Sequence, residues 1–293
     1  MTRVLPLLGT AASLSANRPP TPSTIGRAAT RALYHELALC PKPGLVTLLD
    51  SGSHRDMDAH TFMRSLFALR SYFVAIAELG LQGADFPALE RCGIQAEARM
   101  LAATGGINTH RGAIFMLGLL CAAAGALTRK DVHPSPERLR EALRRGWGQA
   151  LDTRALRLPS LPGGIAARKH GLRSASTEAA LAFPVLFETA VPALVAALAR
   201  GLTAQQARLD TLFHVMAVLD DSNLAHRGGL QGLRHAQQSA RHFLAAGGAA
   251  SPGGLEAARA IGRDFVARKL SPGGAADTLA AACWVVQLCM ACP

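Results

Sequence analysis

The feature that most constrains this chain is its helical period, because apolar residues return every three or four positions from Thr24 onward. Phe62, Leu66 and Leu69 illustrate the spacing, which places one apolar face on a predicted helix over 58–79. The alternation that strands require is nearly absent. The period predicts helices over residues 24–40, 58–79, 88–103, 110–125, 136–150, 175–182, 184–200, 203–219, 229–246, 252–268 and 274–290.

The composition favours close packing of these helices. Hydrophobic residues make up 49% of the chain but aromatic residues only 5%, so the core must consist mainly of Ala, Leu and Val. Small aliphatic side chains let helices approach closely. We therefore predict an all-α fold, a single globular domain of roughly ten helices over residues 23–293. Residues 1–22, rich in Ser, Pro and Thr, are predicted to form a mobile N-terminal arm.

The net charge of +11 favours anionic partners, which include nucleic acids, membrane surfaces and phosphorylated small molecules. Lysines and arginines are scattered, however, and no run of them exceeds two residues. No stretch reaches the ~18 uninterrupted apolar residues of a membrane span. The six cysteines show no paired metal-binding or disulfide pattern. We expect a cytoplasmic protein that binds neither nucleic acid nor membranes, and the sequence leaves its oligomeric state open.

Residues suited to chemistry gather in the breaks between the predicted helices. Loops held by a rigid scaffold are where binding and catalysis usually occur, and helix ends can converge on one cavity. We therefore predict an active site formed by inter-helix loops. The segments concerned are 41–58, 104–112, 169–178, 220–229 and 271–277.

Two of these segments, 106–112 and 222–229, each place an amide, an imidazole and a guanidinium near glycines at a helix end. Helix N-termini bind anions, and guanidinium groups suit phosphate. Lys42, between two prolines, lies in a stiff turn that would orient its ammonium group. Taken alone, each segment also fits an ordinary helix cap with surface charge. The predicted triphosphate- and nucleotide-binding residues are Lys42, Asn108, His110, Arg111, Asn223, His226 and Arg227.

Acidic residues in the same breaks are candidates for metal binding and catalysis. Asp56 and Asp58 could hold Mg²⁺ beside substrate phosphates, but Asp58 is explained as a helix N-cap. Asp220 and Asp221 follow an apolar helix, where acids oppose the helix dipole unless a cation offsets them. Glu36 is either a buried general base or the solvent side of its helix. The predicted metal ligands are Asp56, Asp220 and Asp221, and the predicted catalytic residues are Asp56 and Glu36.

In order along the chain, these motifs resemble the triphosphoribosyl-dephospho-coenzyme A synthases, from about residue 25 to the C-terminus. Members of that family serve either citrate lyase or malonate decarboxylase, and this chain resembles the malonate decarboxylase type more closely. The motifs that carry the resemblance are Pro41-Lys42-Pro43-Gly44-Leu45-Val46, His54-Arg55-Asp56-Met57-Asp58, Gly106-Ile107-Asn108-Thr109-His110-Arg111-Gly112-Ala113-Ile114-Phe115, Asp221-Ser222-Asn223 with His226-Arg227-Gly228-Gly229, and Ser271-Pro272-Gly273-Gly274-Ala275-Ala276-Asp277.

The resemblance implies a pentosyltransferase that joins the triphosphoribosyl group of ATP to the 2′-hydroxyl of 3′-dephospho-coenzyme A and releases adenine. The product would be the precursor of a prosthetic group that a separate transferase attaches to an acyl-carrier subunit. Mg²⁺ is expected with ATP. In that reaction the basic residues named above would hold the triphosphate, and Asp56 or Glu36 would deprotonate the acceptor hydroxyl.

The chain departs from the family pattern between residues 173 and 184. The family tends to carry a compact Arg-Gly-Glu-Ala-like motif and then Gly-Phe-Pro, whereas this chain has Arg173 and Glu178 separated by four residues and then Ala182-Phe183-Pro184. The roles of Arg173 and Glu178 therefore stay open.

Two other functions remain as alternatives at this point. An all-α, Mg²⁺-dependent hydrolase of ADP-ribose-type N-glycosidic bonds would use similar loop carboxylates and would release adenine from ATP without an acceptor. A basic nucleic-acid-binding helical protein would instead show DNA retention that depends steeply on salt.

Overall fold

The fold is seen in a computed structural model that describes residues 18–290, and within that range all regular structure is helical. The prediction of an all-α fold is confirmed. The helices are α1 (Pro22–Leu37), α2 (Ala59–Gln82), α3 (Phe86–Thr104), α4 (Arg111–Thr128), α5 (Pro136–Ala155), α6 (Pro162–His170), α7 (Ala175–Ala180), α8 (Val191–Ala199), α9 (Ala204–Val218), α10 (Ser222–Ala245), α11 (Gly254–Ala267) and α12 (Gly273–Cys289), with a π-helix η1 (Val185–Ala190) and a 3₁₀ turn η2 (Gly248–Ala250).

The helix boundaries agree with the sequence pattern at most ends and differ at a few. Helix α6 was not predicted, because its glycines and prolines interrupt the apolar period. Helix α10 begins at Ser222, not near 229; Gly229 has a positive φ of 63° and marks a kink inside the helix. Most of the predicted N-terminal arm, residues 1–17 of 1–22, lies outside the described residues. Helix α1 begins at Pro22, the last residue assigned to that arm.

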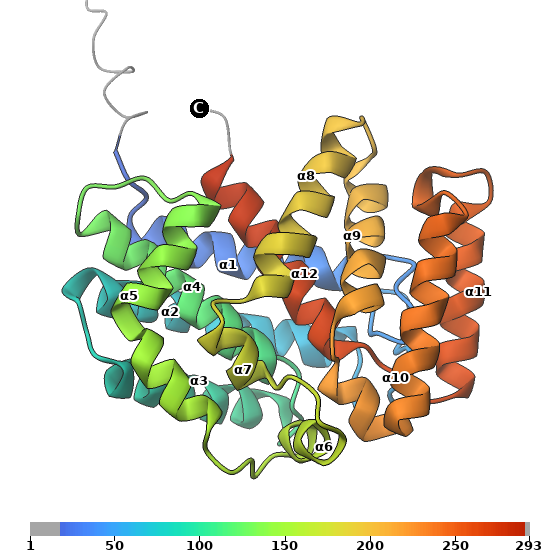
Figure 1. The fold of residues 1–293 in the computed structure, drawn as a ribbon, viewed down its shortest axis with the longest axis horizontal. Helices are drawn as coiled ribbons and strands as arrows, with labels where there is room; N and C mark the ends of the chain where they lie inside the picture. The colour runs from blue at the N-terminus through green and yellow to red at the C-terminus, as the bar shows by residue number, and fades with distance from the viewer. Residues whose placement is uncertain (1–17, 291–293) are drawn as a thin grey trace, which may run out of the picture.

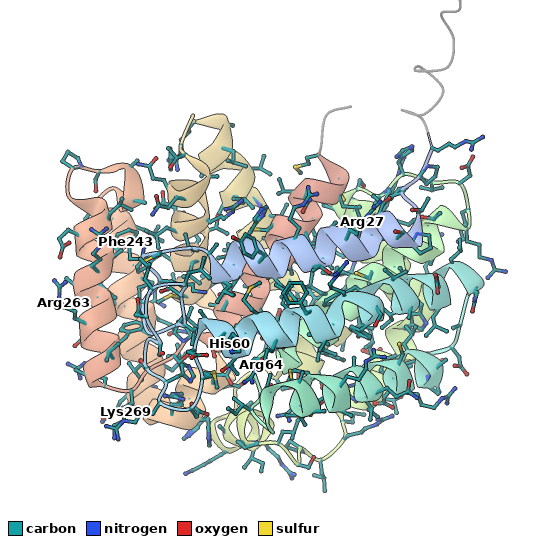
Figure 2. All side chains as sticks on the ribbon, turned by 180° about the vertical axis from the view of Figure 1, so that it is seen from behind. Arg27, His60, Arg64, Phe243, Arg263 and Lys269 are labelled. Atoms are coloured by element: carbon teal, nitrogen blue, oxygen red, sulfur yellow. The ribbon has the colours of Figure 1, made fainter. Side chains whose placement is uncertain are left out.

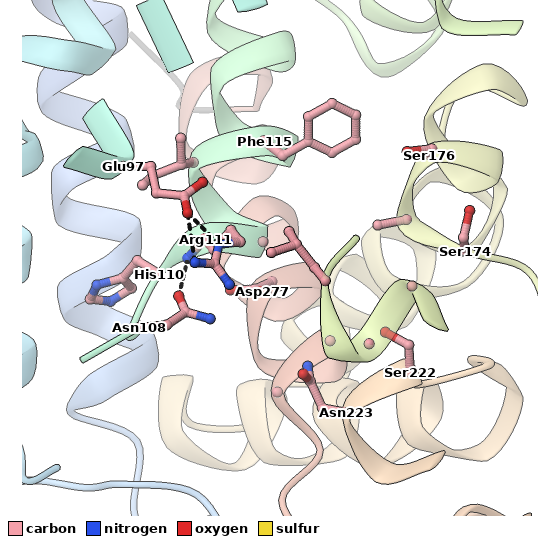
Figure 3. A pocket seen from close by; sticks show the side chains of 18 of the residues that line it. Glu97, Asn108, His110, Arg111, Phe115, Ser174, Ser176, Ser222, Asn223 and Asp277 are labelled. Carbon is pink, nitrogen blue, oxygen red and sulfur yellow. Dashed lines mark hydrogen bonds and ion pairs between the residues drawn. The ribbon is translucent and has the colours of Figure 1, made fainter. Parts of the chain in front are cut away.

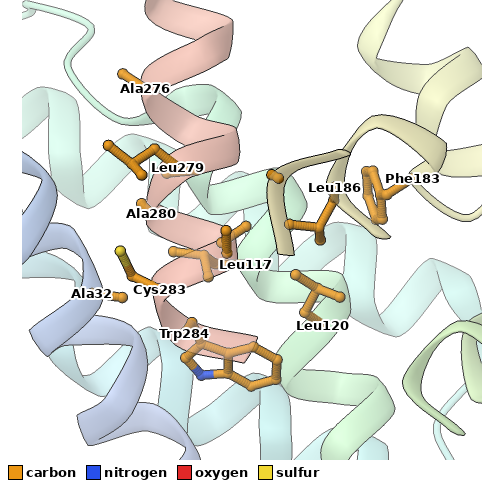
Figure 4. Close-up of a cluster of buried hydrophobic side chains, with 14 of the residues drawn as sticks. Ala32, Leu117, Leu120, Phe183, Leu186, Ala276, Leu279, Ala280, Cys283 and Trp284 are labelled. Carbon is orange, nitrogen blue, oxygen red and sulfur yellow. The ribbon is translucent and has the colours of Figure 1, made fainter. Parts of the chain in front are cut away.

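Helices α4 and α12 supply much of the central core of the molecule. Helix α12 passes between α1 on one side and α8 and α9 on the other, while α1, α2 and α3 lie side by side on the face turned toward the viewer in Figure 2. Trp284 and Leu279 of α12 pack with Leu117 and Leu120 of α4 and with Leu186 of η1 (Figure 4). One continuous hydrophobic cluster results, as the single-domain prediction requires.

Helices α2 and α4 approach so closely that glycine is needed on both. A β-carbon added at Gly80 would lie 2.0 Å from the carbonyl oxygen of Ala122, and one added at Gly125 would lie 2.0 Å from that of Ala77. Backbones can come this near only where side chains are absent or minimal. The alanine- and glycine-rich composition therefore allows α4 to pack closely against α2 within the core.

Ala182 and Phe183 connect α7 to η1 in the left-handed region, with φ of 55° and 52°. A residue with a β-carbon pays roughly 1–2 kcal/mol for this conformation, which glycine adopts freely. Glycine would remove this cost at position 182, where the chain has alanine.

Helix α4 is the one helix in the described range that is long and apolar enough to cross a membrane. Within the fold, 67% of that segment is buried against the other helices. It is thus packed as the core helix of a globular domain.

Candidate functional site

A cavity of about 1120 Å³ lies between α2, α3 and α4 on one side and α6, α10 and α12 on the other (Figure 3). Helices α4, α6, α10 and α12 are among those that begin at it, because their first residues, Arg111, Pro162, Ser222 and Gly273, line the cavity. The first N–H groups of a helix have no intrahelical partner and carry partial positive charge. The geometry therefore favours an anionic ligand here.

The two similar segments of the sequence form two walls of this one cavity. Asn108 and Arg111 line it from the start of α4, and Asn223 lines it from the start of α10 (Figure 3). His226, one turn further along α10, is also part of the lining. More than a hundred residues separate the two segments, and the fold brings them together. Their roles in ligand binding remain a prediction.

Lys42 and Glu36, predicted for different roles, are partners of each other. The Lys42 ammonium donates to Glu36 Oε1 at 2.5 Å and to the Glu36 carbonyl oxygen at 2.9 Å. Both residues are buried, with exposed fractions of 5% and 4%. Glu36 thus faces the interior and not solvent. An ion pair this deep leaves neither group free without a rearrangement, because breaking it would strand a buried charge.

The imidazole of His110 is neutral in the folded protein near pH 7. Its Nδ1 lies 2.6 Å from the Ser65 hydroxyl, and desolvation lowers the pKa of the imidazole to about 3. Its Nε2 is buried and has no hydrogen-bond partner among the described residues. If Ser65 donates to Nδ1, Nε2 carries the proton and remains a donor for a ligand. His110 could therefore bind phosphate by a hydrogen bond but not as a cation.

The guanidinium groups are already partly engaged. Arg111 Nε and Nη2 each donate to Glu97 Oε1 at 2.6 Å, while Asn108 Oδ1 accepts from the Arg111 backbone N–H and so helps to cap α4. Arg227 donates from Nε to the Lys269 carbonyl at 2.8 Å and from Nη2 to the Ser53 carbonyl at 2.7 Å. Each guanidinium keeps further N–H groups beyond these bonds.

The three predicted metal ligands are not gathered into one site. Asp56 is at the rim, with 64% of its side chain exposed, and Asp220 Oδ2 accepts from the Arg173 backbone N–H at 3.1 Å. Asp221 is buried, and its carboxylate accepts N–H groups of Asn223, Leu224 and Ala275. Within residues 18–290 no three His, Cys, Asp or Glu side chains form a group that could hold a metal ion. A metal centre built from three such side chains does not fit this arrangement; one or two of these carboxylates could still bind Mg²⁺ together with substrate phosphates.

The sequence interpretation of Asp221 was wrong in one physical respect. Its carboxylate is the N-cap of α10, so it stabilises the start of one helix and does not oppose the dipole at the end of another. Burial nevertheless raises the pKa of Asp221 to about 6, with the backbone hydrogen bonds acting against that shift.

Arg173 and Glu178, whose roles the sequence left open, form an ion pair beside the cavity. Arg173 Nε lies 3.2 Å from Glu178 Oε1, and Glu178 Oε2 accepts from the Val185 backbone N–H at 3.4 Å. Burial raises the pKa of Glu178. The pair thus connects the start of α7 to the start of η1 and supports the left-handed turn between them.

Asp277 and Glu97 line the cavity and were not among the predicted site residues. Asp277 ends the Ser271–Asp277 motif, and its position four residues after Gly273 places it on the cavity side of α12; that spacing was the available signal. Glu97 gave no local signal, because its partner Arg111 is fourteen residues away and only the packing of α3 on α4 joins them.

Comparison with known proteins adds to this geometry. A family model described as ATP:dephospho-CoA triphosphoribosyl transferase matches residues 22–291. Three similar proteins are designated probable 2-(5″-triphosphoribosyl)-3′-dephosphocoenzyme-A synthase. The one from Vibrio cholerae is 37% identical over 91% of this chain and 88% of its own length; that from Azotobacter vinelandii is 40% identical over 92% and 93%; that from Acinetobacter calcoaceticus is 36% identical over 89% of each. No solved structure matches the chain.

Proposed function

Because the chain belongs to the ATP:dephospho-CoA triphosphoribosyl transferase family and is a transferase, we propose that it joins the triphosphoribosyl group of ATP to the 2′-hydroxyl of 3′-dephospho-coenzyme A with release of adenine. The observation that carries this proposal is the mixed lining of the cavity. It includes helix N-termini with polar side chains as well as a set of apolar side chains from α3, α4 and the segment between α5 and α6. A reaction between two nucleotides, one of which bears a long pantetheine arm, needs both.

The polar portion of the cavity supports binding of the triphosphate. The N-termini of α4, α10 and α12 supply backbone N–H groups, His110 supplies a neutral donor, and His226 and Arg227 supply side chains near the opening. Because no three His, Cys, Asp or Glu side chains of the described residues form a metal-binding group, we propose that Mg²⁺ enters with ATP, coordinated mainly by phosphate oxygens and water.

The apolar portion of the cavity, which we call the groove, supports binding of the acceptor. Ile94 and Phe115 line it from α3 and α4, and Leu156, Leu158 and Leu161 line it from the segment between α5 and α6. Leu156 and Leu158 are 85% and 75% exposed, which is unusual for leucines beside a cavity. A pantetheine arm would cover them. This groove favours the transferase over a hydrolase of ADP-ribose-type bonds, which has no apolar arm to bind.

The chemistry requires breakage of the bond between the ribose C1′ and adenine N9 while the triphosphate stays intact. The transition state should resemble an oxocarbenium ion, as in glycoside hydrolysis. Asp56 and Glu36 remain our proposed bases for the acceptor hydroxyl. Asp56 is open to substrate at the rim, whereas Glu36 could act only after Lys42 moves to a phosphate. Once the acceptor occupies the groove, water would also be excluded from the ribose C1′. Water would otherwise hydrolyse ATP to adenine and triphosphoribose.

We further propose that the product is the precursor of the prosthetic group of an acyl-carrier subunit, attached there by a separate transferase. We propose that the protein serves a malonate decarboxylase system rather than a citrate lyase system, in a cytoplasmic setting without nucleic-acid or membrane partners.

A direct assay tests the reaction. The purified protein is incubated with Mg²⁺, ATP labelled on its γ-phosphate, and 3′-dephospho-coenzyme A, and adenine and product are quantified by chromatography and mass spectrometry. We expect one adenine per product molecule and full retention of the label in the product. Adenine release without the acceptor would instead support the hydrolase. Absence of adenine release in every mixture would refute the proposal.

A further inference from the structure

Asp277 lies where the start of α4 meets the second turn of α12. It is partly buried and lines the cavity. A β-carbon added at Gly112 would lie 2.0 Å from Asp277 Oδ2, so the glycine is what allows this carboxyl to lie against the first turn of α4. Figure 3 shows Asp277 directed toward the Arg111 end of that helix. The carboxyl is therefore placed among the groups that would surround ATP.

The surroundings of Asp277 favour its protonated form. Burial is the largest cause that raises its pKa well above the ordinary range, and the carboxylates of Glu36 and Asp221 add to the shift. A hydrogen bond from the Ala113 backbone N–H acts in the opposite direction but is the smaller influence. Of the two carboxyls that act on it, Glu36 is already paired with the Lys42 ammonium and Asp221 accepts backbone N–H groups. These surroundings favour a neutral carboxylic acid on the cavity wall.

The other acids that line the cavity have different arrangements. Glu36 is paired with Lys42, Glu97 with Arg111, and Glu90 with both Arg154 and Arg157. Asp56 lies at the open rim beside His54. Asp277 is the acid of this set that has no ion-pair partner within residues 18–290. Asp277 therefore lies in the cavity without a cationic partner, as a carboxyl that donates a proton should.

Resting on the proposed function, we propose that Asp277 is a further catalytic residue, the general acid that protonates adenine as it leaves. The C1′–N9 bond breaks, and its electron pair passes into the purine. The carboxyl proton of Asp277 moves to a ring nitrogen, so that neutral adenine departs. The new bond forms between C1′ and the acceptor O2′, whose proton passes through a base to water. Asp277 then takes a proton back from water, so the net proton count is unchanged.

Asp277→Asn tests this role, because the amide keeps the size of the side chain and can still accept from Ala113 but cannot transfer a proton. We expect kcat with ATP to fall by about 100- to 10,000-fold, the usual range for loss of a general acid, with KM for ATP changed by less than about threefold. Asp277→Glu retains an acid and should be at least about tenfold faster than the amide variant. Glu90→Gln, which removes another cavity carboxyl, is the matched control and should lose less than about tenfold.

A leaving-group series separates proton donation from a structural effect. ATP analogues with progressively more electron-withdrawing groups at purine position 2 depart with less help from a proton. The deficit of Asp277→Asn should therefore shrink along the series. An equal deficit on every analogue, a defect in KM alone, or no deficit at all would overturn the inference.

Thermal unfolding and ATP binding of each variant show whether it is folded, and should Asp277→Asn fail to fold, the comparison is made with Asp277→Ser. The proposed function is tested separately by the wild-type protein. If the wild type releases no adenine with both substrates, the reaction is wrong. If it does and Asp277→Asn is unimpaired, only the assignment of Asp277 is wrong.

Discussion

At the scale of single residues, the fold decides which groups near the cavity are charged. His110 illustrates this, since an imidazole that is ordinarily half-protonated at mildly acidic pH is held neutral by burial between α2 and α4. Its pKa falls from 6.5 to about 3. A group whose pKa is lower in the folded state contributes stability above its unfolded pKa, and this contribution is lost as pH falls.

His110→Asn should therefore remove part of the acid sensitivity of the protein. The free energy of unfolding of the wild type, relative to the variant, should decrease by about 2 kcal/mol between pH 7 and pH 5, because the unfolded histidine takes up a proton that the folded one refuses. Urea unfolding at the two pH values measures the difference. His133→Asn, which replaces an exposed imidazole, is the control. A difference between wild type and His110→Asn that does not change with pH would contradict the shifted pKa.

The sequence located these residues but not their partners. Asn108, His110 and Arg111 could be recognised as helix-start chemistry from local pattern alone. That Ser65 would bond to His110, and Glu97 to Arg111, depends on how α2 and α3 pack on α4. Hydrogen bonds between distant residues leave no periodic trace in a single sequence, so these partners could not have been predicted.

At the scale of elements, the close contact of α2 and α4 holds the C-terminal half of α4 against the core. Gly80 and Gly125 lie against backbone carbonyl groups of the facing helix. A larger residue at either position would push the helices apart or force a strained backbone, and overpacking of this kind destabilises a core.

Gly125→Ala should lower the free energy of unfolding by about 2 kcal/mol or more, since the new methyl would overlap the Ala77 carbonyl. Gly146→Ala makes the same chemical change in the exposed middle of α5, where nothing lies within 4 Å. It should stabilise the protein by about 0.5–1 kcal/mol through helix propensity. Denaturant unfolding of both variants tests the contrast, and similar effects of the two changes would contradict the close packing.

Most elements followed from their local signals, and the exceptions have identifiable causes. Capping by Asp58 marked the start of α2, and Ser135 followed by a proline marked the start of α5. Helix α3 begins two residues before its predicted start, where Asp85 is the cap. Helix α6 was missed because Gly163 and Gly164 weaken its local propensity, and it is held by packing on α10. Tertiary contacts thus outweigh propensity where an element is short.

At the scale of the whole molecule, the cavity joins segments from nearly every part of the described chain. The groove between α3, α4 and the segment after α5 is its apolar portion, and the helix N-termini are its polar portion. If the groove holds the pantetheine arm, the two substrates should respond to different substitutions.

Leu158→Ser should raise KM for 3′-dephospho-coenzyme A about fivefold. The variant loses apolar contact with the acceptor that contributes roughly 1 kcal/mol of binding free energy. KM for ATP should be unchanged. Leu49→Ser alters a leucine of similar exposure, 81% against 75%, that does not line the cavity, and serves as the control. Steady-state kinetics with each substrate varied in turn makes the comparison. An equal rise in both KM values, or none in either, would argue against this placement of the acceptor.

The sequence by itself determined the fold class, most helix positions, the family, and the segments that carry polar chemistry, because period, capping and motif order are local and are written directly in the chain. Only the tertiary structure decided which of those groups meet and in what charge state. It paired Lys42 with Glu36, made His110 neutral, turned Asp221 into a cap, and placed Asp277 against α4. The physical reason is that burial, desolvation and contact between distant segments exist only once the helices have packed.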